Sequence, residues 1–383
     1  MKRIAALDML RGYALAAIMV DHMPDGVMRN FTLANFAVFD AAELFVLLSG
    51  FLVGLVWLTV EQKSGRRAAQ WRFLRRAFQV WIALVIGGIL LALVSRALLE
   101  AGLVHTAVWS AYARWIVEFP IGYIVTVGTL WMQPNLLDVL ALYVIVLAFT
   151  PLTVPLMRRW PWAFVIGSVA LWAVSGPLNQ LLPNQRGTTG MLFNPFAWQL
   201  LFHTGVMMGL YRSQIMPVLR RHSTMLTTFS VIYVIFGIAF AQFWRYGPEL
   251  KEVWYMLRDL VGSVDKWSLD WVRYVGILVA AWLVAGPLSG PMAWLADTVI
   301  GRALAVIGRG GLVTFIACVM LSIIGDALMT VPGGADTWFR TAVEIWTLGV
   351  LWLVGIIEAR RSGRRKLAAR GPADKDGPGA SRV

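Results

Sequence analysis

The segment LDMLRGYALAAIMVDHM, residues 7–23, is an apolar run that also carries the ionisable residues Asp8, Arg11, Asp21 and His22. Its length is close to that of a helix that crosses a hydrocarbon layer of about 30 Å. An ionised side chain at membrane depth is costly and normally faces a cavity or a partner. The segment therefore predicts a first membrane-spanning helix, and its charged residues are candidates for function.

Arg11 and His22 are eleven positions apart in this segment. Eleven helical steps of about 100° bring His22 back to within roughly 20° of the direction of Arg11, about 16 Å further along the axis. We therefore expect both side chains on one face of the helix. The alternative is structural: Asp8 and Arg11 neutralise each other, while Asp21 and His22 end the helix at the water interface.

Composition extends the membrane prediction to the whole chain. Of 383 residues, 58% are apolar and 19 are tryptophan, and the mean hydropathy is +0.68. These values exclude an ordinary soluble enzyme and predict an all-α, polytopic membrane helix bundle. The net charge of +13 comes from cations that alternate with apolar runs. Such a pattern indicates membrane orientation and contact with membrane lipids, not a nucleic-acid partner. Cys318 is the single cysteine, so no cysteine-based metal site is possible and no metal is expected.

Ten apolar runs have lengths suited to membrane spans. The stretch from Glu100 to Pro134 is aromatic and only partly apolar, so it is expected to re-enter the membrane, to lie on its surface, or to add one more span. The expected spans are 5–24, 41–60, 74–98, 135–156, 162–179, 194–212, 225–243, 271–288, 304–327 and 338–358.

Ten spans place both termini on one side of the membrane. The larger groups of cations then fall on that same side, which the positive-inside rule identifies as the cytoplasm. The chain is thus expected to comprise an integral membrane domain, 1–358, and a basic, disordered cytoplasmic tail, 359–383. The cations in question are Lys2, Arg3, the run from Lys63 to Arg76, Arg158, Arg159, Arg212, Arg220, Arg221 and the tail from Arg360 to Arg370.

The same topology brings polar residues of several spans to one depth near the extracytoplasmic side. His22 is then level with Glu43, Asp138 and Asn194. A neutral imidazole that is hydrogen-bonded to a carboxylate is a common general base for a hydroxyl group. Asp21 points about 100° away from His22 on an ideal helix, so Glu43 or Asp138 is the expected orienting partner.

Helix capping is the alternative for these acids, because residues 40–43 resemble a capping box and Asp138 opens a span. The resulting catalytic candidates are His22, Glu43, Asp21 and Asp138. The substrate-binding candidates at the same level are Asn194, Trp198 and Gln199.

Cations gather at the opposite depth. Arg11 is expected level with Arg309 and with the basic stretch 63–76. Guanidinium groups bind phosphate well, so Arg11, Arg309 and the neighbouring Asp8 are candidates for binding a phosphorylated cofactor. Lipid headgroups are the alternative ligand of the basic stretch. Gly50 and Gly54 form a G-x-x-x-G pair that predicts close helix packing.

No phosphate-binding P-loop, H-E-x-x-H zinc motif or G-x-S-x-G elbow is present. The sequence therefore gives no support to ATP hydrolysis, zinc proteolysis or serine hydrolase chemistry.

Several motifs resemble the OpgC family, membrane enzymes that add succinyl groups to osmoregulated periplasmic glucans and are related to the acyltransferase-3 membrane O-acyltransferases. The likeness runs from about residue 3 to residue 358. Its motifs are LDMLRG at 7–12, the Asp21–His22 pair, DAAELFVLLSGF at 40–51, LDVLALY at 137–143 and FNPFAWQ at 193–199.

The resemblance implies an enzyme of the bacterial inner membrane that transfers an acyl group from cytoplasmic acyl-CoA, either succinyl-CoA or acetyl-CoA, to a hydroxyl of a periplasmic glucan or another envelope glycan. In the acyltransferase-3 group, an arginine and a histidine separated by ten residues mark the active site, and Arg11 and His22 keep that spacing. His22 is then expected to activate the hydroxyl, and Arg11 to bind the CoA arm. The alternatives are an O-acetyltransferase of another envelope polysaccharide and a carrier for a carboxylated solute.

Overall fold

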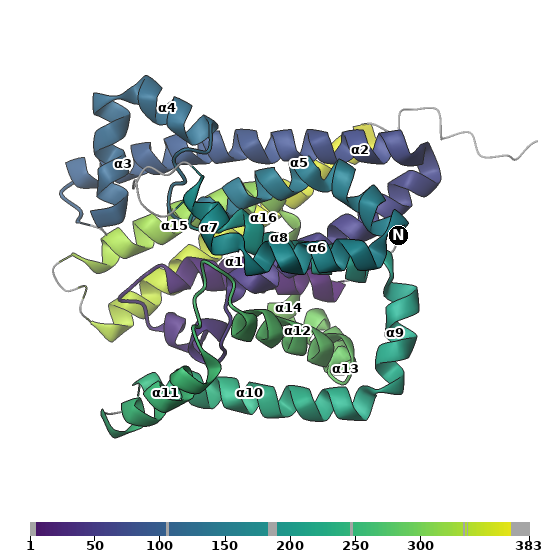
Figure 1. Ribbon diagram of the computed structural model, residues 1–383. Coiled ribbons are helices and arrows are strands. Elements are labelled where there is room, and N and C mark those ends of the chain that lie inside the picture. The colour runs from purple at the N-terminus through teal and green to yellow at the C-terminus, as the bar shows by residue number, and fades with distance from the viewer. Residues whose placement is uncertain are drawn as a thin grey trace, which may run out of the picture.

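The structure, a computed structural model, describes residues 5–104, 107–182, 190–245, 248–331, 334 and 336–368. Lys2, Arg3 and positions 369–383 of the expected tail lie outside these ranges. The described part is helical and contains no strand, as expected for an all-α chain. Most of the longer helices lie side by side with their axes roughly aligned, whereas α9 crosses one end of the bundle (Figure 1). The α-helices are α1 (Ala5–Asp21), α2 (Ala41–Glu100), α3 (Ala107–Glu118), α4 (Pro120–Gly128), α5 (Asp138–Arg159), α6 (Pro161–Ala173), α7 (Ser175–Gln180), α8 (Pro195–Leu210), α9 (Arg212–Arg221), α10 (Ser223–Arg245), α11 (Pro248–Val261), α12 (Trp271–Ala285), α13 (Ser289–Asp297), α14 (Val299–Arg309), α15 (Gly311–Met329) and α16 (Thr337–Ala368).

The ten expected spans all lie largely on helices, but fewer helices are long enough to cross a membrane alone. Within the described ranges, α2, α5, α10, α15 and α16 have the required length and apolar composition. The pair α12 and α13, bent by 75°, adds a sixth if it forms one broken span. Helix α2 contains two of the expected spans because it turns back at Gly65, where φ is 81° and ψ is 169°. The count of ten spans stays a prediction.

Two boundaries differ from those expected. The run 304–327 is two helices, since α14 ends at Arg309 and Gly311 adopts a left-handed φ of 61° before α15. Helix α16 continues to Ala368 and so includes the first ten positions of the expected tail. The stretch from Glu100 to Pro134 forms two short helices, α3 and α4, that pack on α2.

Glycines bring α2 and α8 into backbone contact, as the G-x-x-x-G pair predicted. A Cβ atom placed on Gly50 would lie 2.1 Å from the carbonyl oxygen of Phe202, and one on Gly54 would lie 2.3 Å from that of Val206. Any larger side chain at these positions would force the two helices apart. The close contact fixes the start of α2, with Asp40 and Glu43, relative to the start of α8.

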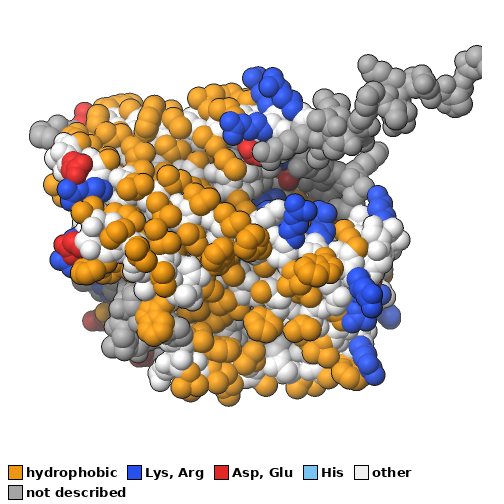
Figure 2. Space-filling view, turned by 90° about the horizontal axis from the view of Figure 1, so that it is seen from above, with side chains coloured by type: hydrophobic (Ala, Val, Ile, Leu, Met, Phe, Trp, Pro, Cys, Tyr) orange, Lys and Arg blue, Asp and Glu red, His pale blue; other side chains and the backbone are white. Residues whose placement is uncertain are grey.

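The bundle has two chemically different ends. Most Lys and Arg side chains on the face drawn in Figure 2 lie at one end, next to a broad apolar surface. That end, here called the basic end, holds the beginning of α1, the turn of α2 at Gly65 and α9 (Figure 1). The opposite end, here called the His22 end, holds the end of α1 and the beginning of α2.

Candidate active site

His22 follows the last residue of α1 and is half-buried at the His22 end. Its Nδ1 atom lies 2.7 Å from the carbonyl oxygen of Ile18. A carbonyl oxygen only accepts hydrogen bonds, so Nδ1 must carry the proton. This tautomer leaves the lone pair of the neutral ring on Nε2, and Nε2 has no hydrogen-bond partner among the described residues. The arrangement suits Nε2 for accepting a proton.

The orienting partner of His22 is therefore a backbone carbonyl, whereas a carboxylate from another helix was expected. Glu43 is instead fully buried, and the Nε atom of Arg273 donates to its Oε1 atom over 2.6 Å. Asp138 opens α5, where its Oδ1 atom accepts a hydrogen bond of 2.9 Å from the backbone N–H of Val139. Asp21 accepts a hydrogen bond of 2.5 Å from the hydroxyl of Thr32.

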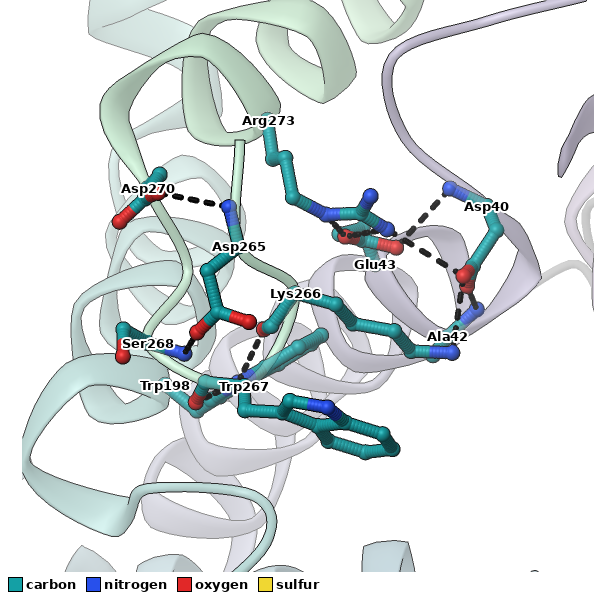
Figure 3. A network of polar contacts seen from close by, with 10 residues as sticks. All are labelled: Asp40, Ala42, Glu43, Trp198, Asp265, Lys266, Trp267, Ser268, Asp270 and Arg273. Carbon is teal, nitrogen blue, oxygen red and sulfur yellow. Dashed lines mark hydrogen bonds and ion pairs between the residues drawn. The ribbon is translucent and has the colours of Figure 1, made fainter. Parts of the chain in front are cut away.

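Four charged side chains, those of Asp40, Glu43, Lys266 and Arg273, form an ion cluster, which is drawn in Figure 3. Asp40 caps α2: its side chain accepts from the N–H of Ala42, and the side chain of Glu43 accepts from the N–H of Asp40, so the predicted capping box is present. The Nζ atom of Lys266 lies 2.8 Å from Oδ2 of Asp40, and an Nη atom of Arg273 donates to the same oxygen over 3.2 Å. The cluster thus joins the start of α2 to the start of α12.

Two members of the cluster lie outside the helices: Asp40 directly precedes α2, and Lys266 lies in the loop before α12. Opposite charges fix the ionisation of both side chains. Burial acts to raise the pKa of the Asp40 carboxyl, but the charges of Lys266 and Arg273 outweigh burial and hold that pKa below its usual range. Burial acts to lower the pKa of Lys266, but Asp40 and Glu43 outweigh it and raise that pKa. Both groups therefore stay charged around neutral pH.

The imidazole of His22 lies within electrostatic range of this cluster. The charged groups that act on it are Lys266, Asp40 and Arg29. A cation beside a general base can stabilise negative charge that develops on a reacting carbonyl oxygen. Lys266 is therefore our candidate for that role, since it acts electrostatically on His22 whereas Arg11 is about 16 Å away along α1 by helix geometry.

Helix α8 supports the loop that carries Lys266. The N–H of Asn194 donates to the carbonyl of Trp267 over 3.2 Å, and the indole N–H of Trp198 is shared between the carbonyls of Lys266 and Trp267. The side chain of Asn194 also caps α8. These two predicted substrate-binding residues thus hold the ion cluster in place, and direct contact with substrate stays a prediction.

Gln199 lies in a separate polar group, one turn further along α8. Its Oε1 atom accepts from the hydroxyl of Ser168 over 2.6 Å and lies 2.9 Å from Nδ1 of His203. All three side chains are buried. The position indicates that Gln199 joins α8 to α6.

Glu344 of α16 fixes the loop that follows His22. Its buried carboxylate accepts hydrogen bonds of 3.0 Å from the N–H groups of Val27 and Met28. A Cβ atom on Gly26 would lie 2.4 Å from Oε1 of Glu344, so only glycine fits there without a shift. This contact holds one wall of a cavity of about 670 Å³ at the His22 end.

This first cavity, here called the outer cavity, lies between the loop after His22 and the helices α10, α11 and α12. Its charged lining residues are Asp25, Arg29, Arg273 and Arg340. Arg273 is shared with the ion cluster, so the cavity and the cluster are continuous.

A second cavity of about 1010 Å³, here called the basic cavity, opens at the basic end. Two of the predicted cofactor-binding residues, Arg11 and Arg309, line it, and Nε of Arg309 lies 3.6 Å from Oδ2 of the third, Asp8. Arg72, Arg75 and Arg76, from the predicted basic stretch, also line it, together with Trp71. The structure thus brings Arg11, Arg309 and the last three arginines of the basic stretch to one space.

The basic cavity extends along α2 toward the His22 end. Its lining includes Val56, Ser49 and Phe45. These positions span about 16 Å of helix, and Phe45 is two residues from Glu43. Tyr143, which donates a hydrogen bond to the carbonyl of Phe45, also lines this part of the cavity. One cavity is thus lined by five arginines and also by Phe45, two positions along the chain from Glu43.

Sequence reasoning missed Lys266, Arg273 and Glu344. Arg273 and Glu344 lie within the expected spans 271–288 and 338–358. An ionisable residue in such a span is by itself a signal of function or of a buried ion pair. Lys266 gave no signal of this kind, because it lies in a loop with several charges.

Among known families, the one described as OpgC protein matches residues 3–363 of the chain. Searches of curated proteins and of solved structures found no match.

Proposed function

The chain belongs to the OpgC family, and we propose that it is a membrane O-acyltransferase that moves a succinyl group from acyl-CoA to a hydroxyl of a periplasmic glucan. Family membership supports an acyltransferase that acts on periplasmic glucans. Succinyl-CoA as the donor, the cytoplasmic side of its entry and the inner membrane as the location are parts of our proposal.

The basic end faces the cytoplasm in this proposal. The turn of α2 and helix α9 carry clusters of Lys and Arg, and such clusters are retained on the cytoplasmic side of membranes. The His22 end then faces the periplasm. Acyl-CoA and glucan thus approach from opposite sides and meet near the ion cluster.

The basic cavity supports CoA as the donor. Arginine guanidinium groups bind phosphate oxygens in pairs, and Arg72, Arg75, Arg76 and Arg309 line the cavity where it opens. The indole of Trp71 is largely exposed there and offers a surface on which a nucleobase can stack. The part lined by Phe45 then holds the pantetheine arm.

His22 acts as the general base. Its Nε2 atom takes the proton from a glucan hydroxyl while the oxygen attacks the thioester carbonyl, so that a C–O bond forms. The carbonyl oxygen becomes negatively charged, and Lys266 stabilises it. The C–S bond then breaks, and the CoA sulfur receives the proton from His22. Glucan gains the acyl group, and CoA leaves with a free thiol.

The observation that carries the proposal is the reach of the basic cavity. Its lining includes arginines near the turn of α2 and also Phe45, which is two positions along the chain from Glu43 of the ion cluster. In this proposal, a donor that is bound by its phosphates at the basic end extends its acyl group along α2 toward His22.

Mass spectrometry of periplasmic glucans tests the proposal. We expect added succinyl mass with the native chain and none with His22→Ala. His222→Ala is the matched control, because His222 is an exposed histidine at the junction of α9 and α10. Each variant is first checked for native-like elution in detergent. Glucans without succinyl groups in cells with the native chain would reject this acceptor. An acetyl increment would instead identify the donor as acetyl-CoA.

A further inference from the structure

We propose that the outer cavity binds a glycan segment that already carries carboxylate groups. The inference rests on the proposed function for the nature of the polymer. The inference adds that the enzyme recognises glucan that already carries modifications. It does so at a site separate from the one that holds the reacting hydroxyl.

Positive charge dominates the lining of the outer cavity. Arg29 and Arg340 line it beside a single acidic lining residue, Asp25, whereas the third lining arginine, Arg273, is already paired with Asp40 and Glu43. Asp25 is mostly exposed, and its Oδ1 atom lies 3.9 Å from the nearest nitrogen of Arg340, which is too long for a hydrogen bond. The cavity therefore has an excess of hydrogen-bond donors with positive charge.

Each of the three guanidinium groups is held in place by hydrogen bonds from some of its N–H groups, which leaves others for a ligand. Arg29 donates from Nη1 to the carbonyl of Pro24 over 2.7 Å, and Arg340 donates from Nε to the carbonyl of Gly334 over 2.8 Å. Arg273 is fixed by Glu43 and Asp40, as Figure 3 shows. Groups that are oriented in advance lose little conformational entropy when they bind a carboxylate.

Aromatic side chains provide a surface for sugar rings. Trp254 and Phe240 line the cavity, with ring centroids 5.3 Å apart. The apolar faces of pyranose rings pack well on such rings. The volume of about 670 Å³ lies within the usual range of small-molecule sites, so a short segment of a glycan fits.

A neutral glycan leaves the positive charge of this lining uncompensated. Its hydroxyl oxygens can accept hydrogen bonds from guanidinium groups, but they carry no opposite charge. A segment with carboxylates supplies acceptors with the opposite charge. If the enzyme adds succinyl groups, its own product has this chemistry, because each succinyl ester leaves one free carboxylate on the polymer.

The test is a binding measurement with the purified full-length chain and no acyl-CoA. The probes are a fluorescent glucan oligosaccharide and the same oligosaccharide after chemical succinylation. We expect the succinylated probe to bind about tenfold more tightly, and we expect this ratio to fall as salt is raised.

Two variants locate the site. Arg29→Gln and Arg340→Gln are each expected to reduce the preference about threefold, and the double variant to abolish it. Arg114→Gln is the control and should leave the ratio unchanged, since Arg114 is an exposed residue of α3 whose partner Glu118 is also exposed. Binding is compared only among variants that elute like the native chain.

Three outcomes would overturn the inference. They are equal binding of both probes to the native chain, an unchanged preference in the double variant, and competition by free succinate as effective as that by the succinylated probe. The last outcome would mean a small-anion site. Because no acyl transfer is measured, failure here leaves the proposed function standing. Conversely, absence of acyl transfer does not affect the binding result.

Discussion

The Nδ1 atom of His22 donates a hydrogen bond of 2.7 Å to the carbonyl oxygen of Ile18, one turn earlier in the chain. The last carbonyls of a helix have no partner within the helix, so α1 supplies the acceptor that orients the imidazole. The helix that carries His22 thereby sets its tautomer. Nε2 keeps the lone pair and can accept a proton, and no carboxylate is needed to orient the ring.

Replacement of His22 separates catalysis from donor binding. His22→Gln keeps a polar side chain but removes the base, so we expect acyl transfer to fall by about 10² to 10⁴-fold. CoA binding should change by less than about twofold, because the arginines of the basic cavity are untouched. Calorimetric titration with CoA and a radiolabelled transfer assay measure the two quantities. A parallel loss of both would show that His22 is needed for folding or for donor binding.

Replacement in the basic cavity gives the reverse pattern. Arg76→Gln removes a partly buried guanidinium group from the lining. We expect the Kd for CoA to rise about tenfold and to become less sensitive to salt. Arg67→Gln is the control, since Arg67 is exposed at the same end and does not line the cavity. An unchanged Kd for Arg76→Gln would place the CoA phosphates elsewhere.

The Asp40–Lys266 ion pair should contribute a constant amount to the free energy of unfolding over a broad range of pH. The pKa of Asp40 is lowered from its ordinary value of 3.8, so its contribution is complete above that value and is lost as the pH falls through the pKa of the folded state. The pKa of Lys266 is raised from 10.5, so its contribution is complete below that value and is lost as the pH rises through the pKa of the folded state.

We expect Asp40→Asn to cost about 2 kcal/mol of unfolding free energy, less than for a fully buried pair because both side chains are partly exposed. The difference from the native chain should be constant between about pH 5 and pH 9. Thermal unfolding, followed by tryptophan fluorescence across this range, measures it. Asp259→Asn, in an exposed pair with Arg258, should have little effect. A difference that disappears near pH 6 would contradict the assigned ionisation.

Trp198 tests whether the loop of Lys266 must be held for catalysis. Trp198→Phe removes the N–H that two loop carbonyls share, worth about 1 kcal/mol. If that energy positions Lys266, acyl transfer should fall about fivefold. Trp57→Phe is the matched control, because the buried indole nitrogen of Trp57 has no hydrogen-bond partner among the described residues. Equal effects of the two variants would reduce the role of Trp198 to packing.

The sequence predicted helices well because apolar runs and charge clusters are local signals. The capping box at Asp40 and Glu43, the glycine contact of Gly50 and the grouping of Arg11 with Arg309 all follow from spacing and depth. The break before Gly311 was missed, because hydropathy remains high across a change of helix direction.

The partners of the acidic residues were beyond the reach of sequence patterns. Glu43 and Arg273 are 230 positions apart, and nothing in either segment specifies the other. Depth arguments placed Glu43 level with His22, but they do not give the rotation of each helix about its axis. Rotation decides that Glu43 meets Arg273 and that the Ile18 carbonyl takes the proton of His22.

The partners in the ion cluster are far apart along the chain, and this separation has a consequence for biosynthesis. Helix α2 leaves the ribosome long before α12, so Glu43 enters the bilayer without Arg273 and Asp40 without Lys266. A buried carboxylate without a counter-ion is unstable in such surroundings. The beginning of α2 must therefore stay hydrated or protonated until the chain has been made at least as far as Arg273. Nascent chains that stop before residue 262 should remain vulnerable to quality-control proteases.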